Sequence, residues 1–288
     1  MDNEGKTITS ANGDIKAEDI KNGKSFIKRA AEAGKKIVTE LFSDETWKCE
    51  LCSKELFGNG YICKECEEKL PYLKNVNSCN HCGRKTDYEE DYCTACKNIL
   101  TETDLGRSVF NYEGKIILLI TNFKFMRKAY LKKFFAEELY NLYKEENLTA
   151  DVVCYIPMTE KAIKKRGYNQ TELLAEEFSR LSGIPVADAL EKTRDSHKQV
   201  GLKRKERLEN LKGSFKVTDK QAVQGKTVLL IDDVTTTGAT GEVVASYLKK
   251  AGAAKVVLLT VASVGSDKET ELRRKEAENN RKTHKKEK

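Results

Sequence analysis

The sequence lacks any long hydrophobic run. No stretch of its 288 residues approaches the roughly 18 consecutive apolar residues that a membrane span needs. Residues 1–20 also lack the basic segment and the apolar segment that together mark a secretory signal. We therefore expect a cytoplasmic protein without a membrane span.

A complete P-loop is missing as well. Gly225, Lys226 and Thr227 look like the end of one, but no glycine stands at position 220, where a P-loop requires it. The tripeptide also precedes an apolar strand, whereas a P-loop follows its strand. The sequence therefore excludes a P-loop ATPase.

The chain does have length and positive charge. With 288 residues it is long enough for one large domain or two smaller ones. Charged residues make up 34% of it and the net charge is +7, which suits a protein that meets nucleotides, phosphates or nucleic acid. Charge alone does not select among these anionic partners.

Eight of the nine cysteines form four C-x-x-C pairs. In a reducing compartment this pattern favours thiolate ligands for a metal over disulfides. Two such pairs complete one tetrahedral zinc site, so the sequence predicts two structural zinc ions, without which the module should not fold. The predicted ligands are Cys49, Cys52, Cys63, Cys66, Cys79, Cys82, Cys93 and Cys96.

The spacing of the cysteines leaves their grouping open. The pattern of residues 49–66 recurs in residues 79–96, so the sites are either sequential or interleaved, and sequential grouping is the simpler hypothesis. Thioredoxin-like redox chemistry is disfavoured because it needs one C-x-x-C beside a βαβ unit. We expect His81 to be an exposed loop residue, since four thiolates already saturate a zinc ion.

Apolar strands alternate with helical segments downstream of the cysteines, which predicts an α/β fold with a mostly parallel sheet. Residues 169–183 are expected to form a helix closed by Gly183, and residues 151–158 a buried strand ended by Pro157. The other expected strands are 107–112, 184–190, 213–217, 227–234 and 255–263, and the other helical segments are 116–146 and 241–252.

The stretch VLLIDDVTTTGAT, residues 228–240, predicts a ligand site. Four consecutive apolar residues indicate a strand buried on both faces, and parallel α/β sheets bind ligands at the carboxyl ends of such strands. Asp232 and Asp233 would lie there, and the following loop could surround a phosphate at the start of a helix near Gly241. Carboxylates beside a phosphate suit ribose hydroxyls or hydrated Mg²⁺. Alternatively, the aspartates cap a turn and the threonines are ordinary loop residues.

This stretch resembles the phosphoribosyl-pyrophosphate-binding motif of type I phosphoribosyltransferases. Residues 156–175 and 197–215, with the four C-x-x-C pairs, extend the resemblance to the ComF (ComFC-like) family over roughly residues 47–263. The resemblance implies a type I phosphoribosyltransferase-like sheet flanked by helices, behind a small zinc module. The expected parts are a polar N-terminus with an amphipathic helix (1–46), the zinc module (47–100), the phosphoribosyltransferase-like domain (101–264) and a charged tail (265–288).

The resemblance also implies roles for individual residues. Asp232 and Asp233 would contact the ribose hydroxyls as the catalytic acids, and Lys124 would lie near the ligand. The 5′-phosphate would be bound by Thr235, Thr236, Thr237, Gly238, Ala239 and Thr240. Pyrophosphate would be neutralised after Pro157 and by a mobile loop, through Lys161, Lys164, Lys165, Arg166, Gln199, Arg204 and Arg207. The alternative is that these side chains only coat exposed loops. Cys154 is expected to be a small buried hydrophobe.

The implied reaction is displacement of pyrophosphate at the ribose anomeric carbon, a glycosyltransferase reaction. Mg²⁺ and basic side chains would stabilise the leaving group. No pocket for a nucleobase acceptor is recognisable, so the sequence predicts ligand binding more firmly than catalysis. The alternatives are a non-catalytic protein that binds a nucleotide or single-stranded DNA alongside DNA-uptake proteins during competence, and a regulator that senses phosphoribosyl pyrophosphate.

Overall fold

The computed structural model describes residues 47–56, 60–74, 76–86, 91–93, 96–97, 101–194 and 204–265, without the side chains of 204–207. The chain divides into two compact units, Met1–Trp47 and Lys48–Lys288, and the elements that build the site belong to the second. The helix expected within residues 25–42 and the tail from residue 266 lie outside the described residues. Among the described residues, no helix is long and apolar enough to cross a membrane.

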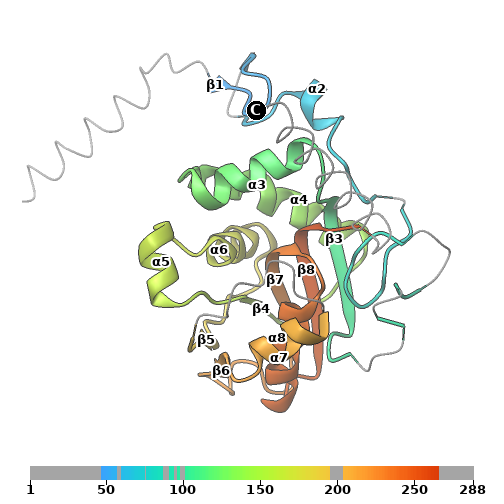
Figure 1. The fold of residues 1–288 in the computed structure, drawn as a ribbon, viewed down its shortest axis with the longest axis vertical. Helices are drawn as coiled ribbons and strands as arrows, with labels where there is room; N and C mark the ends of the chain where they lie inside the picture. The colour runs from blue at the N-terminus through green and yellow to red at the C-terminus, as the bar shows by residue number, and fades with distance from the viewer. Residues whose placement is uncertain are drawn as a thin grey trace, which may run out of the picture. The chain divides into compact units, whose positions relative to one another are not determined.

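A parallel sheet of four strands, in the order β3-β8-β7-β4, forms the centre of the second unit (Figure 1). Leu229 of β7 lies opposite Val153 on β4 and Val257 on β8. The strand that carries the two aspartates is therefore an inner strand of a parallel sheet, as predicted. The strands are β3 (Leu105–Asn111), β4 (Val152–Tyr155), β7 (Thr227–Thr235) and β8 (Lys255–Ser263).

Helices cover both faces of this sheet. Leu229 and Ile231 of β7 pack in one apolar cluster with residues of α3 (Lys115–Phe125), α4 (Lys132–Glu145) and α6 (Gln170–Ser182). Val228 and Leu230 face the opposite way and pack with residues of α7 (Arg204–Leu211) and α8 (Ala239–Lys250). Burial on both faces explains why these four strand positions are all apolar.

The helical pattern of residues 116–146 is interrupted in the structure. Helix α3 ends at Phe125, a short 3₁₀ helix η1 spans Ala129–Leu131, and α4 begins at Lys132. The break falls at Arg127, whose φ of 56° no α-helix contains. The side chains of Lys128 and Tyr130 contact Glu50 in the cysteine region, so a contact distant in sequence holds the chain at the interruption.

The segment after β4 also differs from the sequence-based expectation. Residues expected to form a loop instead form α5 (Glu160–Arg166), because the Thr159 hydroxyl accepts a hydrogen bond from Ala162 N at 3.2 Å and caps it. The next helix, α6, begins after Asn169 and ends at Gly183, as predicted. The remaining strands β5 (Leu190–Lys192) and β6 (Phe215–Val217) form an antiparallel pair.

Candidate ligand site and zinc centres

The eight paired cysteines form two compact clusters. The first contains Cys49, Cys52, Cys63 and Cys66, the second Cys79, Cys82, Cys93 and Cys96, and within each cluster all sulfur atoms lie within 4.8 Å of one another. The grouping is therefore sequential. Short elements frame the first cluster, namely β1 (Trp47–Lys48), β2 (Glu55–Leu56) and α2 (Lys64–Glu67).

The sulfur geometry fits zinc. The Sγ atoms of Cys52 and Cys63 are 3.7 Å apart and those of Cys82 and Cys93 are 3.8 Å apart. A tetrahedral zinc ion with Zn–S bonds of about 2.3 Å requires a sulfur–sulfur separation of about 3.8 Å. A disulfide would require about 2.05 Å, and all the cysteines are free thiols. These clusters support structural zinc at both sites.

His81 is not a ligand of either cluster. Its Nδ1 lies 2.7 Å from Thr101 Oγ1 and 3.1 Å from the Thr103 carbonyl oxygen, and its ring stacks on Tyr92 with 4.5 Å between centroids. His81 is thus a loop residue outside the zinc clusters, as predicted, but it is half-buried and not exposed. Its contacts anchor the second cluster to the segment that leads into β3.

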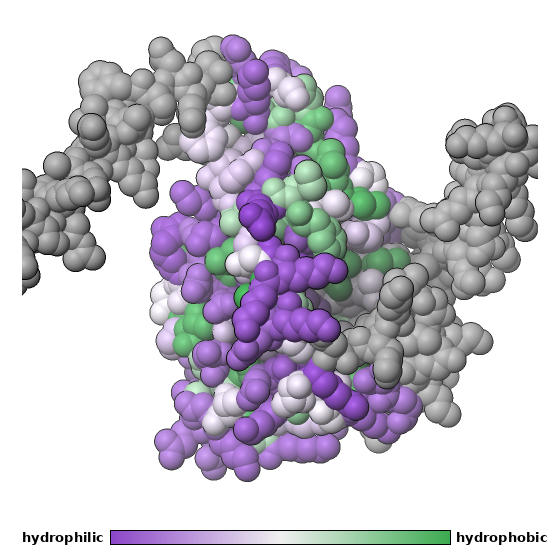
Figure 2. All heavy atoms as spheres, turned by 60° about the vertical axis from the view of Figure 1, so that its left-hand side comes forward, coloured by the Kyte–Doolittle hydropathy of each residue, from purple (hydrophilic) through white to green (hydrophobic). Residues whose placement is uncertain are grey.

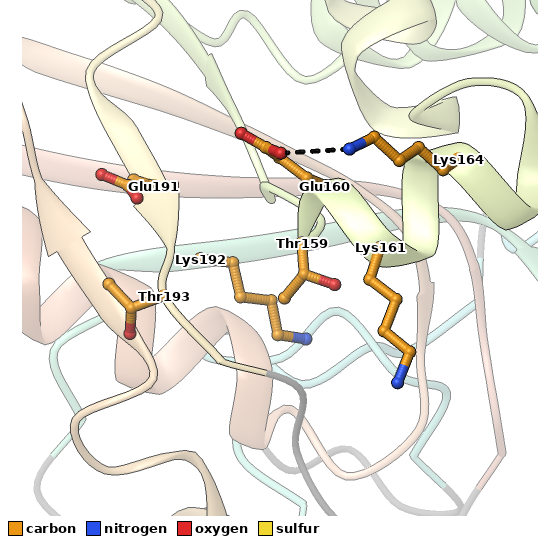
Figure 3. A pocket seen from close by; sticks show the side chains of 7 residues that line it. All are labelled: Thr159, Glu160, Lys161, Lys164, Glu191, Lys192 and Thr193. Atoms are coloured by element: carbon orange, nitrogen blue, oxygen red, sulfur yellow. Dashed lines mark ion pairs between the residues drawn. The ribbon is translucent and has the colours of Figure 1, made fainter.

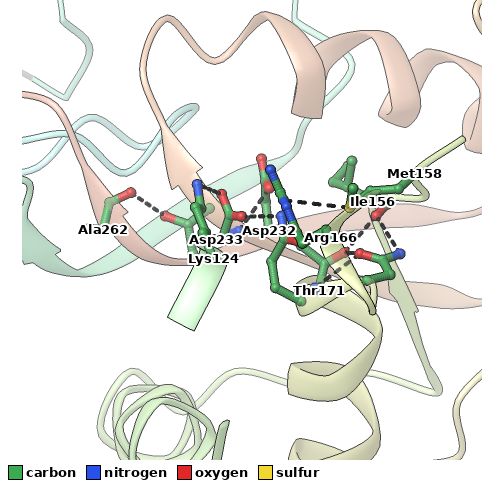
Figure 4. Close-up of polar contacts among 11 residues, drawn as sticks. Lys124, Ile156, Met158, Arg166, Thr171, Asp232, Asp233 and Ala262 are labelled. Atoms are coloured by element: carbon green, nitrogen blue, oxygen red, sulfur yellow. Dashed lines mark hydrogen bonds and ion pairs between the residues drawn. The ribbon is translucent and has the colours of Figure 1, made fainter. Parts of the chain in front are cut away.

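Asp233 is the centre of the polar contacts at the carboxyl end of β7. Its buried carboxylate accepts a hydrogen bond from Lys124 Nζ at 2.7 Å and another from Gln170 Nε2 at 2.5 Å (Figure 4). Lys124 lies in the last turn of α3, and Gln170 is the first residue of α6. Three separate elements therefore converge on one carboxylate. Lys124 was predicted to lie near the ligand, whereas Gln170 was predicted only as part of a helix.

Asp232 lies beside this ion pair and is half-buried. Burial raises the pKa of Asp232 to about 7, the negative charge of Asp233 adds to the shift, and Lys124 and Lys192 oppose it. Its Oδ1 accepts a hydrogen bond from the backbone N–H of Asp233 at 2.8 Å. Placing two adjacent carboxylates in a partly buried site therefore lowers the stability of the folded protein when both are ionised.

The raised pKa of Asp232 predicts how stability depends on pH. Between about pH 4 and pH 7 the folded protein holds a proton that the unfolded chain releases, so the free energy of unfolding falls as pH rises through this range. Asp232→Asn removes this cost. We expect the variant to be more stable than the wild type by about 2 kcal/mol at pH 8, and this gain to disappear below about pH 4, where the carboxyl is protonated in both the folded and the unfolded wild type. Denaturant titrations at both pH values would measure it.

Two comparisons make this test specific. Burial also raises the pKa of Glu138 to about 7. Glu138 is present in both proteins, so its contribution to the pH dependence cancels in the difference between their free energies of unfolding. Glu160→Gln serves as the control, because the Glu160 side chain is 90% exposed and its loss should leave the pH profile unchanged. A profile of Asp232→Asn that runs parallel to the wild type would contradict the assignment.

The expected phosphate loop connects β7 to α8. Gly238 has a φ of 73° and precedes the first residue of α8, Ala239. The loop proper is therefore residues 236–238, while Thr235 is the buried last residue of β7, and Ala239 and Thr240 already belong to the helix. The helix begins two residues earlier than predicted. The first N–H groups of a helix have no partner within it, so this turn offers donors to an anion.

A cavity of about 580 Å³ lies between α5 and β5 (Figure 3). Lys161 and Lys192 approach it from these two elements, while Lys164 is paired with Glu160 at 3.6 Å. The cavity is lined by Thr159, Glu160, Lys161, Lys164, Glu191, Lys192 and Thr193. Lys192 was not among the predicted cations, and its positive charge also lowers the pKa of Asp232. Lys192 lies two residues before the segment 194–207 that was expected to form the mobile loop.

The other predicted cations are placed differently. Arg166 donates to Gln170 Oε1 at 2.5 Å and lies 5.0 Å from the centre of the Phe125 ring, so it is linked to Asp233 through Gln170. Lys165 is exposed and does not line the cavity. Gln199 and the side chains of Arg204 and Arg207 lie outside the described residues.

The unpaired cysteine is a packing residue. Cys154 lies on β4, is fully buried and belongs to the apolar cluster beneath α7 and α8. Burial raises the pKa of its thiol to about 12, so it is protonated at neutral pH. A protonated, inaccessible thiol is a poor nucleophile, in agreement with the expectation from sequence.

The parallel sheet, the strand–acid pair–helix unit and the two cysteine clusters define a phosphoribosyltransferase-type domain joined to a zinc module. Residues 162–283 match the phosphoribosyl transferase domain family, and residues 40–97 match the double zinc ribbon domain family. Named relatives align with about three quarters of the chain, and together with the two domain matches they support a ComF-like phosphoribosyltransferase-fold protein with an N-terminal zinc module.

Three of these relatives come from different bacteria. Competence protein F of Haemophilus influenzae is 27% identical over 73% of this chain and 94% of its own length. DNA utilization protein YhgH of Escherichia coli K12 is 28% identical over 72% of this chain and 93% of its own. Competence protein ComFC of Bacillus subtilis is 28% identical over 76% of this chain and 89% of its own.

Solved structures overlap the chain only in part. The glutamine phosphoribosylpyrophosphate amidotransferase of B. subtilis covers 49% of this chain and 30% of its own, at 18% identity and a TM-score of 0.35. The purine phosphoribosyltransferase of Pyrococcus horikoshii covers 48% of this chain and 85% of its own, at 17% identity and a TM-score of 0.30. At TM-scores this low, neither overlap supports a conclusion about the ligand site.

Proposed function

We propose that the protein binds phosphoribosyl pyrophosphate, or a related ribose 5-phosphate ligand, together with Mg²⁺ at the carboxyl end of β7, in a role linked to competence. The observation that carries the proposal is the convergence of Lys124 and Gln170 on Asp233 beside the start of α8. Carboxylates next to a helix N-terminus match a ligand that presents hydroxyls and a phosphate together.

Each part of the ligand has a counterpart in the site. Asp232 and Asp233 would accept hydrogen bonds from the ribose hydroxyls, and residues 235–240 would bind the 5′-phosphate. Lys161 and Lys192 line a cavity where pyrophosphate would meet positive charge. Bound Mg²⁺ would neutralise the pyrophosphate oxygens. Transfer to an acceptor would break the bond from the anomeric carbon to pyrophosphate and form one to the acceptor, and we propose binding as the step that precedes it.

Calorimetric titration of the zinc-loaded protein with phosphoribosyl pyrophosphate and Mg²⁺ tests the proposal. Replacing both acids, Asp232→Asn with Asp233→Asn, should weaken binding at least about 100-fold, since each lost charge-assisted hydrogen bond costs about 1.5–3 kcal/mol. Asp219→Asn is the matched control, because within the described part of the chain Asp219 accepts a hydrogen bond only from Ala222 N, in the turn after β6. Absence of binding by the folded wild type would refute the proposal, and acceptor-dependent release of pyrophosphate would add catalysis to it.

A second candidate is non-catalytic binding of single-stranded DNA. It is favoured by the exposed hydrophobic side chains of Phe125 and Met126, which are 64% and 63% exposed and directly precede Arg127. The face around α3 and α5 is mostly hydrophilic with hydrophobic side chains among them (Figure 2). Stacking beside positive charge suits single-stranded nucleic acid. Salt-sensitive binding of an oligonucleotide that survives replacement of both aspartates would support this candidate.

A further inference from the structure

The second zinc ribbon, residues 76–97, packs its backbone directly against the sheet. The N–H of Gly106 on β3 donates to the Asn80 carbonyl at 2.6 Å, and the Ser263 hydroxyl at the end of β8 donates to the Gly83 carbonyl at 3.3 Å. A Cβ atom at Gly83 would lie 2.7 Å from the backbone of Arg107. The ribbon is thus fixed against β3 and against the carboxyl end of β8, the strand next to β7.

Arg84 extends from this ribbon into the expected phosphate loop. It follows Cys82 by two residues, is only 2% exposed, and its Nη2 donates a hydrogen bond to the carbonyl oxygen of Thr236. A buried guanidinium is costly unless negative charge and acceptors surround it. A zinc ion with four thiolates carries net negative charge, and Arg84 interacts electrostatically with Cys82. The cluster therefore favours burial of the arginine at this point.

The contact between Arg84 and Thr236 also sets the orientation of the next N–H group in the loop. In a planar trans peptide the C=O of one residue and the N–H of the next point in opposite directions. Holding the Thr236 carbonyl toward Arg84 therefore turns the Thr237 N–H away from the ribbon. The start of α8 is also held by the segment between the second cysteine cluster and β3, because the Glu242 carboxylate accepts hydrogen bonds from Glu102 N and from Thr103 Oγ1, the latter at 3.4 Å.

We infer that Arg84 is a positioning residue of the phosphate loop, through which the second zinc ribbon fixes the peptide between Thr236 and Thr237 for anion binding. The ligand in this inference rests on the proposed function, whereas the ordering of the loop does not. The sequence alone gives no sign of this role, since Arg84 and Thr236 are 152 positions apart.

Amide hydrogen exchange of a peptide covering residues 234–242 tests the inference. Arg84→Met should retain both zinc ions, speed exchange in this peptide at least about tenfold, and weaken binding of ribose 5-phosphate about tenfold. Arg84→Lys keeps a charged donor and should recover part of both losses. Arg107→Met is the matched control, because Arg107 bonds Asn80 of the ribbon at 3.2 Å and Glu146 at 3.0 Å and should leave the loop unchanged.

The outcomes separate this inference from the proposed function. Unchanged exchange in Arg84→Met, or equal acceleration in Arg107→Met, would overturn the positioning role. Faster exchange in Arg84→Met alone, with no ribose 5-phosphate binding by the wild type, would support the positioning role and refute the ligand. If Arg84→Met loses zinc, the positioning role is tested on Arg84→Lys that retains both zinc ions. Amide exchange in residues 234–242 of that variant at the wild-type rate would support a role for the retained charge.

Discussion

Cys82→Ser is expected to release one of the two zinc ions and to unfold the second ribbon. The buried cluster of this ribbon consists of Cys79, Cys82, Cys93 and Cys96 alone among the described residues, without an aliphatic side chain. Its stability therefore depends on the metal, and zinc contributes about 10–16 kcal/mol to folding in small modules of this kind. Zinc analysis and limited proteolysis within residues 76–97 would measure the loss.

The first ribbon, which contains the first cysteine cluster, should depend less on zinc for its folding than the second. Cys49, Cys63 and Cys66 belong to the large apolar cluster that also contains Ile62 and Leu70, so the first ribbon retains a core when its metal is lost. We expect Cys52→Ser to release one zinc ion with a smaller loss of protease resistance than Cys82→Ser.

A buried cysteine outside both clusters provides the control for the zinc experiment. Cys154→Ala should retain both zinc ions, because Cys154 packs in the sheet and not in a cluster. Retention of both zinc ions by Cys82→Ser, with an intact ribbon, would contradict the assignment of the second site.

Gly106→Ala is expected to displace the second ribbon from the sheet. A Cβ atom at this position would lie 2.5 Å from the His81 carbonyl oxygen and 2.9 Å from the backbone carbonyl carbon of Cys82. These are backbone atoms, so no side-chain rotation relieves the clash. The ribbon must move, and the hydrogen bond of 2.6 Å from Gly106 N to the Asn80 carbonyl is lost. We expect a loss of about 3 kcal/mol or more in the free energy of unfolding.

Denaturant titration measures this loss, with Gly60→Ala as the matched control. Gly60 has no atom closer than 3.9 Å to an added Cβ atom and is not among the glycines with positive φ. The control should change stability by less than about 1 kcal/mol. If Arg84 positions the phosphate loop, Gly106→Ala should also speed exchange in residues 234–242. Equal stability of the two variants would show that the ribbon does not pack tightly on β3.

Local patterns in the sequence were sufficient for several elements. The run of four apolar residues identified β7 as a strand buried on both faces, and Gly183 marked the end of α6. The repeated C-x-x-C spacing identified the cysteines that form the two clusters. Each of these features depends on neighbours within a few turns or a short loop, where spacing and conformational preference act directly.

Only the tertiary structure decided how these elements meet. Lys124 and Gln170 reach Asp233 across 109 and 63 positions of sequence, and Arg84 reaches Thr236 across 152. The break of the helical pattern at Arg127 has the same origin, since Lys128 and Tyr130 contact Glu50. Such contacts depend on how strands are ordered and how a zinc ribbon packs on them, and no local preference records that order. The sequence by itself therefore determined the cysteine ligands and the strand that carries the two aspartates, and packing decided which other side chains meet them.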